Sequence, residues 1–140
     1  MAESNFPPEL PYTPESPPPQ PARTARRLRA ESIALRQRAV QMSEASQALR
    51  DTFAAALLQL ETGIAPHAVA LSEVRAARAR LHHEAARLAL LLRAGGAPPE
   101  EMVVEVKREI GAAAPHVWGP RRQALAAEVV RWSIETYYAA

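Results

Sequence analysis

Apolar and polar residues alternate at helical spacing through the middle of the chain. Between Ala22 and Thr62 there is no Pro or Gly, and strong helix formers such as Ala, Arg, Leu, Gln and Glu predominate. One heptad track holds Leu28, Leu35, Met42, Leu49 and Ala56, and a second holds Ala25, Ser32, Ala39, Ser46, Phe53 and Leu60. The pattern predicts one long helix, roughly 60 Å at 1.5 Å per residue. The small residues of the second track would let another helix approach closely.

A second helix is predicted from about Ala68 or Ser72 to Gly95-Gly96, after a loop marked by Gly63 and Pro66. Its heptad tracks are Leu71, Ala85 and Leu92, and Val74, Leu81 and Leu88. A short loop between two long helices makes them antiparallel neighbours. From Leu60 with Leu71 to Ala39 with Leu92, the residue numbers of each facing pair total 130 or 131. One layer is irregular, because it sets Phe53 against Arg78.

Two shorter helices are predicted after the hairpin. Pro98-Pro99-Glu100-Glu101 is typical of a helix start, and the apolar face that follows ends near Gly111. A turn over residues 115–120 precedes a last helix, from Gly119 to Ala140. The apolar positions are Met102, Val103, Val106 and Ile110 in the third helix, and Leu125, Val129, Trp132, Ile134 and Tyr137 in the fourth.

These elements predict an all-α fold of four helices in three segments. Residues 1–21 hold 8 of the 13 prolines and three Glu but no basic residue, which predicts a disordered, acidic, proline-rich tail. Residues 22–94 form a long antiparallel, coiled-coil-like hairpin. Residues 95–140 form a two-helix segment that packs on the hairpin or on a second chain.

In this register the second helix ends opposite about Arg36, so residues 22–35 have no partner in the hairpin. They carry Leu28, Ile33 and Leu35, each of which gains roughly 1.5 kcal/mol or more when fully buried. Either the C-terminal helices cover them within the chain, or a second chain covers them in a dimer. A two-helix hairpin is also too thin to be stable alone, which calls for one of the same two coverings, and of these we favour the dimer.

A cluster of arginines raises nucleic acid as an alternative partner. The segment 23–38 contains six Arg, at positions 23, 26, 27, 29, 36 and 38, against the single Glu31, and such a cluster could meet the phosphates of a nucleic acid. No aromatic residue lies within it to stack on bases, and the acidic tail could neutralise it. Because Lys107 is the only Lys, the Arg bias also fits a GC-rich genome, and a solvated helix face is favoured over nucleic-acid binding.

Catalytic and metal-binding patterns are missing from the sequence, so we expect a non-enzymatic protein without cofactor or metal. His82 and His83 are adjacent on a helix and point about 100° apart, which prevents them from sharing one metal ion. There is no Cys, no Glu-x-x-His pair and no phosphate-binding glycine loop. No apolar stretch is long enough to span a bilayer and no signal-peptide pattern is present, so we expect a cytoplasmic protein.

Four of the seven aromatic residues lie in the last 23 positions. Trp and Tyr dominate interface hot spots, although Trp132 is more simply a core residue, and Tyr137 and Tyr138 point in different directions. The first hypothesis is therefore a protein-protein interaction or oligomerisation module that forms homo-oligomers. The alternatives are a nucleic-acid-associated protein and an amphipathic surface-coating protein. The proline-rich tail is a spacer, or a ligand for an SH3-type groove. The candidate interaction residues are Arg26, Arg27, Leu28, Arg29, Ile33, Leu35, Trp118, Trp132, Tyr137 and Tyr138.

Overall fold

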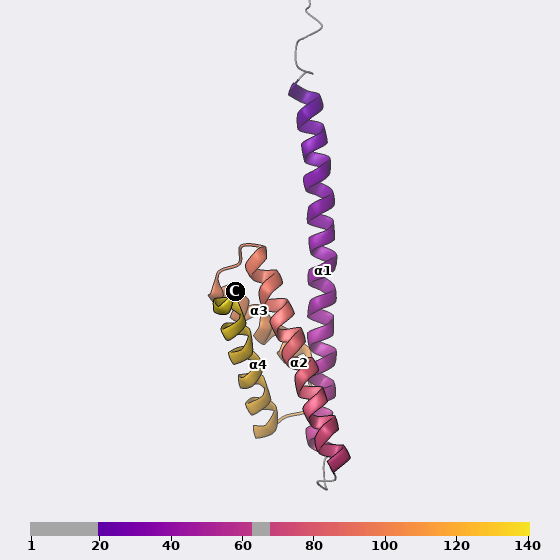
Figure 1. The fold of residues 1–140 in the computed structure, drawn as a ribbon, viewed down its shortest axis with the longest axis vertical. Coiled ribbons are helices and arrows are strands. Elements are labelled where there is room, and N and C mark those ends of the chain that lie inside the picture. The colour runs from indigo at the N-terminus through magenta and orange to yellow at the C-terminus, as the bar shows by residue number, and fades with distance from the viewer. Residues whose placement is uncertain (1–19, 63–67) are drawn as a thin grey trace, which may run out of the picture. The chain divides into compact units, whose positions relative to one another are not determined.

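The computed structural model describes residues 20–62 and 68–140, and all of its regular structure is helical. Over these residues the helices are α1 (Gln20–Thr62), α2 (Ala68–Ala94), α3 (Pro99–Ala112) and α4 (Pro120–Ala139). The predicted all-α fold of four helices, with the long first helix packed against the second, is confirmed (Figure 1). The predictions for the proline-rich tail and for the Gly63-Pro66 loop lie outside the described residues.

Glycine and proline set the helix ends. At the end of α2, the Gly96 N–H bonds to the Arg93 carbonyl and the Ala97 N–H to the Leu92 carbonyl, both at 3.0 Å. This is the Schellman motif, which places the residue after the cap in the left-handed region, and Gly96 has a φ of 86°. Pro99 then begins α3 and Pro120 begins α4, where a proline lacks only a hydrogen bond that the first helical turn cannot make.

Replacing Gly96 with alanine is expected to lower the free energy of unfolding by about 1–2 kcal/mol, because the left-handed conformation strains any residue with a Cβ. Gly111 is the matched control. It lies within α3, and a Cβ there would meet no atom within 4 Å. Gly111→Ala should leave stability unchanged or raise it by up to about 1 kcal/mol. Urea unfolding of both variants checks the pair, and equal effects would contradict the assignment.

The chain divides into two units, one ending at Arg36 and one covering residues 37–140. The second unit holds the core, in which α2 lies against α1, α3 and α4 (Figure 1). Among the described residues, the buried apolar side chains are Ala45, Leu49, Phe53, Ala56 and Leu57 of α1, Ala77, Leu81, Ala85, Leu88 and Ala89 of α2, Met102, Val106 and Ile110 of α3, Ala113, and Leu125 and Val129 of α4. Residues 37–140 therefore form a helical bundle in which the C-terminal helices cover the hairpin.

The core confirms the middle of the predicted hairpin seam, where Leu49, Leu81 and Leu88 are buried. Ala39 and Leu71, at the two ends of the predicted register, are exposed instead. The irregular layer is resolved by α4. Arg78 pairs with the Glu128 carboxylate there, while the Phe53 ring is fully buried.

In the first unit the structure describes only the start of α1. Every side chain from residue 21 to residue 36 is exposed. The predicted division into segments 1–21, 22–94 and 95–140 stays a prediction.

Candidate interaction surfaces

An apolar stripe lies on the exposed N-terminal part of α1. Leu28 and Leu35 are 55% and 62% exposed, and they lie two helical turns apart on the same face. Ala25 and Ser32 share this face, so the four residues form what we call the leucine stripe. Ile33 is 55% exposed but points to a different side of the helix. Exposure of large apolar side chains at regular spacing is typical of a surface that binds another protein.

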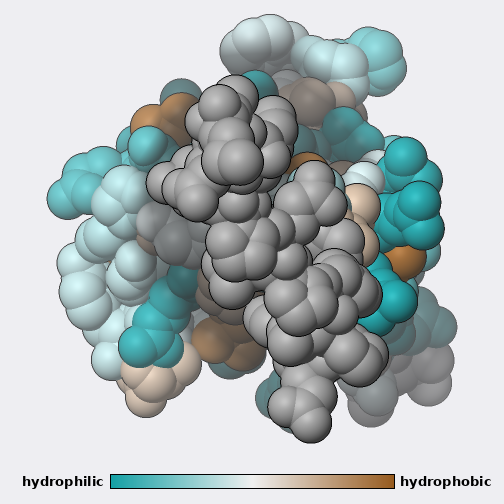
Figure 2. Space-filling view, turned by 90° about the horizontal axis from the view of Figure 1, so that it is seen from above, coloured by the Kyte–Doolittle hydropathy of each residue, from teal (hydrophilic) through white to brown (hydrophobic). Residues whose placement is uncertain are grey.

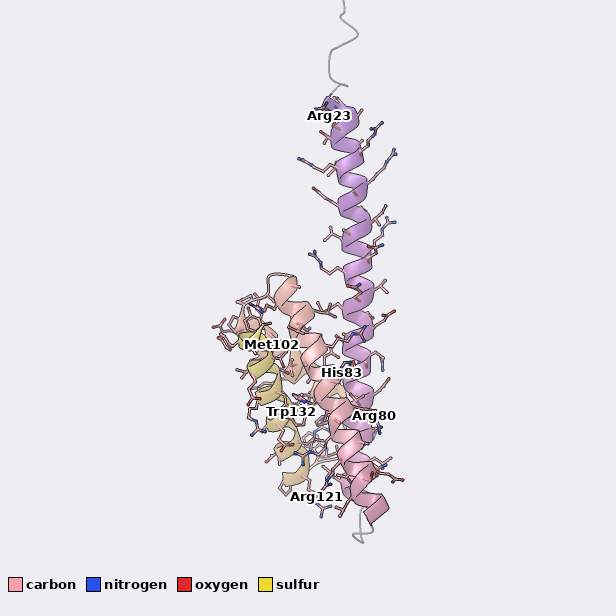
Figure 3. All side chains as sticks on the ribbon, in the orientation of Figure 1. Arg23, Arg80, His83, Met102, Arg121 and Trp132 are labelled. Atoms are coloured by element: carbon pink, nitrogen blue, oxygen red, sulfur yellow. The ribbon has the colours of Figure 1, made fainter. Side chains whose placement is uncertain are left out.

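Arginines border the leucine stripe on both sides. Successive helical residues are about 100° apart, so Arg27 and Arg29 flank Leu28, and Arg36 flanks Leu35. Arg27 lies 3.6 Å from Glu31, and both side chains are well exposed. Arg29 and Arg36 have no ion-pair partner within the described residues. Figure 3 shows side chains extending from all sides of this part of α1, Arg23 among them.

The sequence-predicted aromatic residues divide into two kinds. Trp118 is 84% exposed in the loop before α4, and Tyr138 is 68% exposed near the end of α4. Trp132 is half-buried, with its ring centroid 4.8 Å from that of His82 on α2, and His82 itself is exposed. Tyr137 donates a hydrogen bond of 2.8 Å to the Ala97 carbonyl. Trp118 and Tyr138 are thus available to a partner, whereas Trp132 and Tyr137 hold the bundle together.

The loop that carries Trp118 is fixed by Arg122. One guanidinium nitrogen donates to the Ala113 and Ala114 carbonyls at 2.8 and 2.7 Å, and the other to the Ile110 carbonyl at 2.8 Å. These oxygens lie at the end of α3, where a helix has unpaired carbonyls and a partial negative charge. The guanidinium also lies 5.4 Å from the centre of the Phe53 ring. Arg122 therefore ties the α3–α4 loop to the core.

A groove of about 550 Å³ lies in the second unit where α3 begins. Its apolar lining comes from three helices and the turn between α2 and α3, and consists of Met42, Leu92, Ala97 and Val104, while Glu100, Glu101 and Glu105 supply carboxylates. Glu105 pairs with Arg108, but neither Glu100 nor Glu101 has an ion-pair partner within the described residues. We call this site the acidic groove. It offers apolar contact and negative charge together.

A second groove, of about 540 Å³, lies between α3 and α4. Ile110, Ala126 and Val130 line its apolar part, and Lys107 and Arg122 its basic part. Because Arg122 already donates to carbonyls, Lys107 is the free cation of this groove among the described residues. On the face drawn in Figure 2, the coloured residues are a mixture of hydrophilic residues and smaller hydrophobic areas.

Neither a metal cluster nor a membrane span is found in the part of the chain that the structure describes. No three His, Asp or Glu side chains of residues 20–62 and 68–140 come together as a metal site needs. Within the same residues, no helix has both the length and the apolar content to cross a bilayer.

The acidic groove was not predicted from the sequence. In the sequence, Glu100 and Glu101 indicate only a helix start, and they do lie in the first turn of α3. Glu100 and Glu101 also line a groove together with Met42, which is more than fifty positions away in the chain. No local signal in the sequence indicates that contact.

Comparison with known proteins gives no relative: no family model, no curated protein and no solved structure matches the chain.

Proposed function

We propose that the protein is a non-enzymatic helical module that binds a second copy of itself through the N-terminal part of α1. The observation that supports this proposal best is the exposure of Leu28 and Leu35 on one face of a helix, since apolar residues at this spacing are normally buried. Trp118 and Tyr138 are exposed as well and would extend the interface or bind a further protein.

The free energy of burying the leucines limits the affinity that the leucine stripe can give to a dimer. Covering the exposed part of each leucine contributes about 1–2 kcal/mol, so four leucines in a dimer contribute about 4–8 kcal/mol. A micromolar dissociation constant corresponds to about 8 kcal/mol, before the entropic cost of association. Leucine burial by itself therefore supports weak association, and further contacts must strengthen it.

Nucleic-acid binding is the competing proposal, and the exposed arginines of residues 23–38 favour it. The self-association proposal is preferred because Leu28 and Leu35 have no role on a phosphate backbone. An amphipathic surface-coating role would use the same leucines at a lipid surface. The predicted cytoplasmic location and the absence of enzymatic activity stay predictions.

The double substitution Leu28→Gln and Leu35→Gln in the full chain is expected to weaken self-association at least tenfold. Glutamine keeps helix propensity, so the change removes apolar area without disrupting α1. Light scattering over a dilution series measures the mass, and circular dichroism checks the helix content. The matched control is Leu58→Gln with Leu90→Gln, two leucines that are also exposed but belong to the second unit.

The control should associate like the parent chain. If the parent is a monomer at every concentration, self-association is wrong. Salt-sensitive binding of an oligonucleotide that is lost when Arg26, Arg27 and Arg29 become Gln would then support the nucleic-acid alternative. Flotation of the parent with liposomes would support the surface-coating alternative.

A further inference from the structure

The acidic groove and the leucine stripe complement each other in charge, and both offer apolar side chains. The groove has an apolar lining from Met42, Leu92 and Val104, and Glu100 and Glu101 are its carboxylates without an ion-pair partner among the residues that the structure describes. The stripe is an apolar ridge on a single helix, with arginines along both edges. A helix whose apolar face enters a groove is a common mode of recognition between proteins.

The groove has exposed apolar surface at Val104. The Val104 side chain is 62% exposed although it lies beside Glu100 and Glu101 on α3, and it belongs to the groove lining. Met42 and Leu92 are only partly buried, although they pack against the core. A leucine seated here would cover these three side chains as well as itself, which adds the apolar area that the stripe alone lacks.

Charge decides between the groove and a second stripe as the binding surface. Two leucine stripes packed together bring Arg27, Arg29 and Arg36 of one chain near the same residues of the other, and like charges brought together at an interface oppose association. The groove instead offers Glu100 and Glu101 to those arginines. Arginine also binds carboxylates through two parallel hydrogen bonds, which fixes orientation.

We propose that the acidic groove binds the leucine stripe of a second copy of this chain, with Arg29 and Arg36 facing Glu100 and Glu101. This inference rests on the proposed self-association and names the surface that receives the stripe. Each copy contributes one stripe and one groove. When the stripe of each copy binds the groove of the other, the contact is made twice in a symmetric dimer.

Charge exchange between the two surfaces tests the proposal in the full chain. One variant carries Arg29→Glu and Arg36→Glu, and the other carries Glu100→Arg and Glu101→Arg. Each alone is expected to self-associate at least tenfold more weakly than the parent, because like charges then face each other. An equimolar mixture of the two should form a heterodimer with an affinity near that of the parent, measured by sedimentation velocity with one variant fluorescently labelled.

The matched control is Glu73→Arg with Glu135→Arg, which makes the same change in net charge at two exposed carboxylates outside the groove. It should associate like the parent. Because acids at a helix start stabilise the helix, Glu100→Gln with Glu101→Gln serves as a milder second variant, and circular dichroism verifies that each variant is folded.

Three results have distinct meanings. A folded groove variant that associates like the parent would overturn the groove as the receiving surface while leaving self-association intact. Two variants that each lose association but do not recover it when mixed would also overturn the pairing. A parent chain that is monomeric throughout would instead defeat the proposed function itself.

Discussion

Replacing Phe53 with alanine is expected to lower the free energy of unfolding by about 3–5 kcal/mol, the usual cost of truncating a fully buried aromatic side chain. Phe53 is 0% exposed and is the largest side chain of the core. The substitution would leave a cavity in the core, and it would also remove the ring that faces the Arg122 guanidinium. Since small domains have only about 5–15 kcal/mol of stability, the variant should lose a large part of it.

Urea unfolding followed by circular dichroism measures this loss. Leu58→Ala is the control, because Leu58 lies on the same helix but is 63% exposed. Its effect should stay within about 0.5 kcal/mol apart from small propensity terms. A Phe53→Ala variant that loses less than about 1 kcal/mol would contradict the packing of α1 against the C-terminal helices.

Replacing Arg122 with alanine is expected to cost about 2–4 kcal/mol, because several carbonyls at the end of α3 would lose a charged donor at once. The carbonyls of Ile110, Ala113 and Ala114 all accept from this one side chain at 2.7–2.8 Å. The contact with the Phe53 ring would be lost as well.

Two comparisons distinguish this role from the effect of charge. Arg122→Lys should recover only part of the loss, since an ammonium group cannot span the same carbonyls as a planar guanidinium. Arg121→Ala removes an adjacent, exposed arginine whose guanidinium donates to one carbonyl, that of Leu60. It should cost less than about 1.5 kcal/mol. Equal losses at positions 121 and 122 would contradict a special role for Arg122.

The helices and their limits could be predicted from local patterns. Uninterrupted helix formers gave α1, and Gly95-Gly96, Pro99 and Pro120 gave the ends of the others, because these residues act on their own backbone. The exposure of Leu28, Ile33 and Leu35 also agrees with the expectation that the hairpin gives them no cover.

Local patterns could not predict how many faces of each hairpin helix are buried. The two heptad tracks describe a seam between two helices, and they do not include Ala45, Leu57, Ala77 and Ala89, all of which are buried. These residues are covered because α3 and α4 also pack on the hairpin, which widens the buried face of each helix beyond the two heptad tracks.

Polar contacts between residues far apart in the chain could not be predicted from the sequence either. Arg78 meets Glu128, and Arg50 lies 3.1 Å from Glu109, across separations that no local spacing encodes. The irregular pairing of Phe53 with Arg78 was the one visible signal that a further element must lie beside the hairpin. The acidic groove belongs to the same class, because its lining comes from three separate helices and the turn between α2 and α3.

Hydrogen-deuterium exchange of residues 22–36 over a dilution series tests most directly whether this part of α1 is an interface. Backbone amides in a helix that packs on nothing exchange rapidly. The proposal predicts that these residues are protected at high concentration, that protection falls on dilution in parallel with the mass, and that Leu28→Gln with Leu35→Gln removes it. Rapid exchange at every concentration, or protection that persists in the monomer, would contradict the proposal.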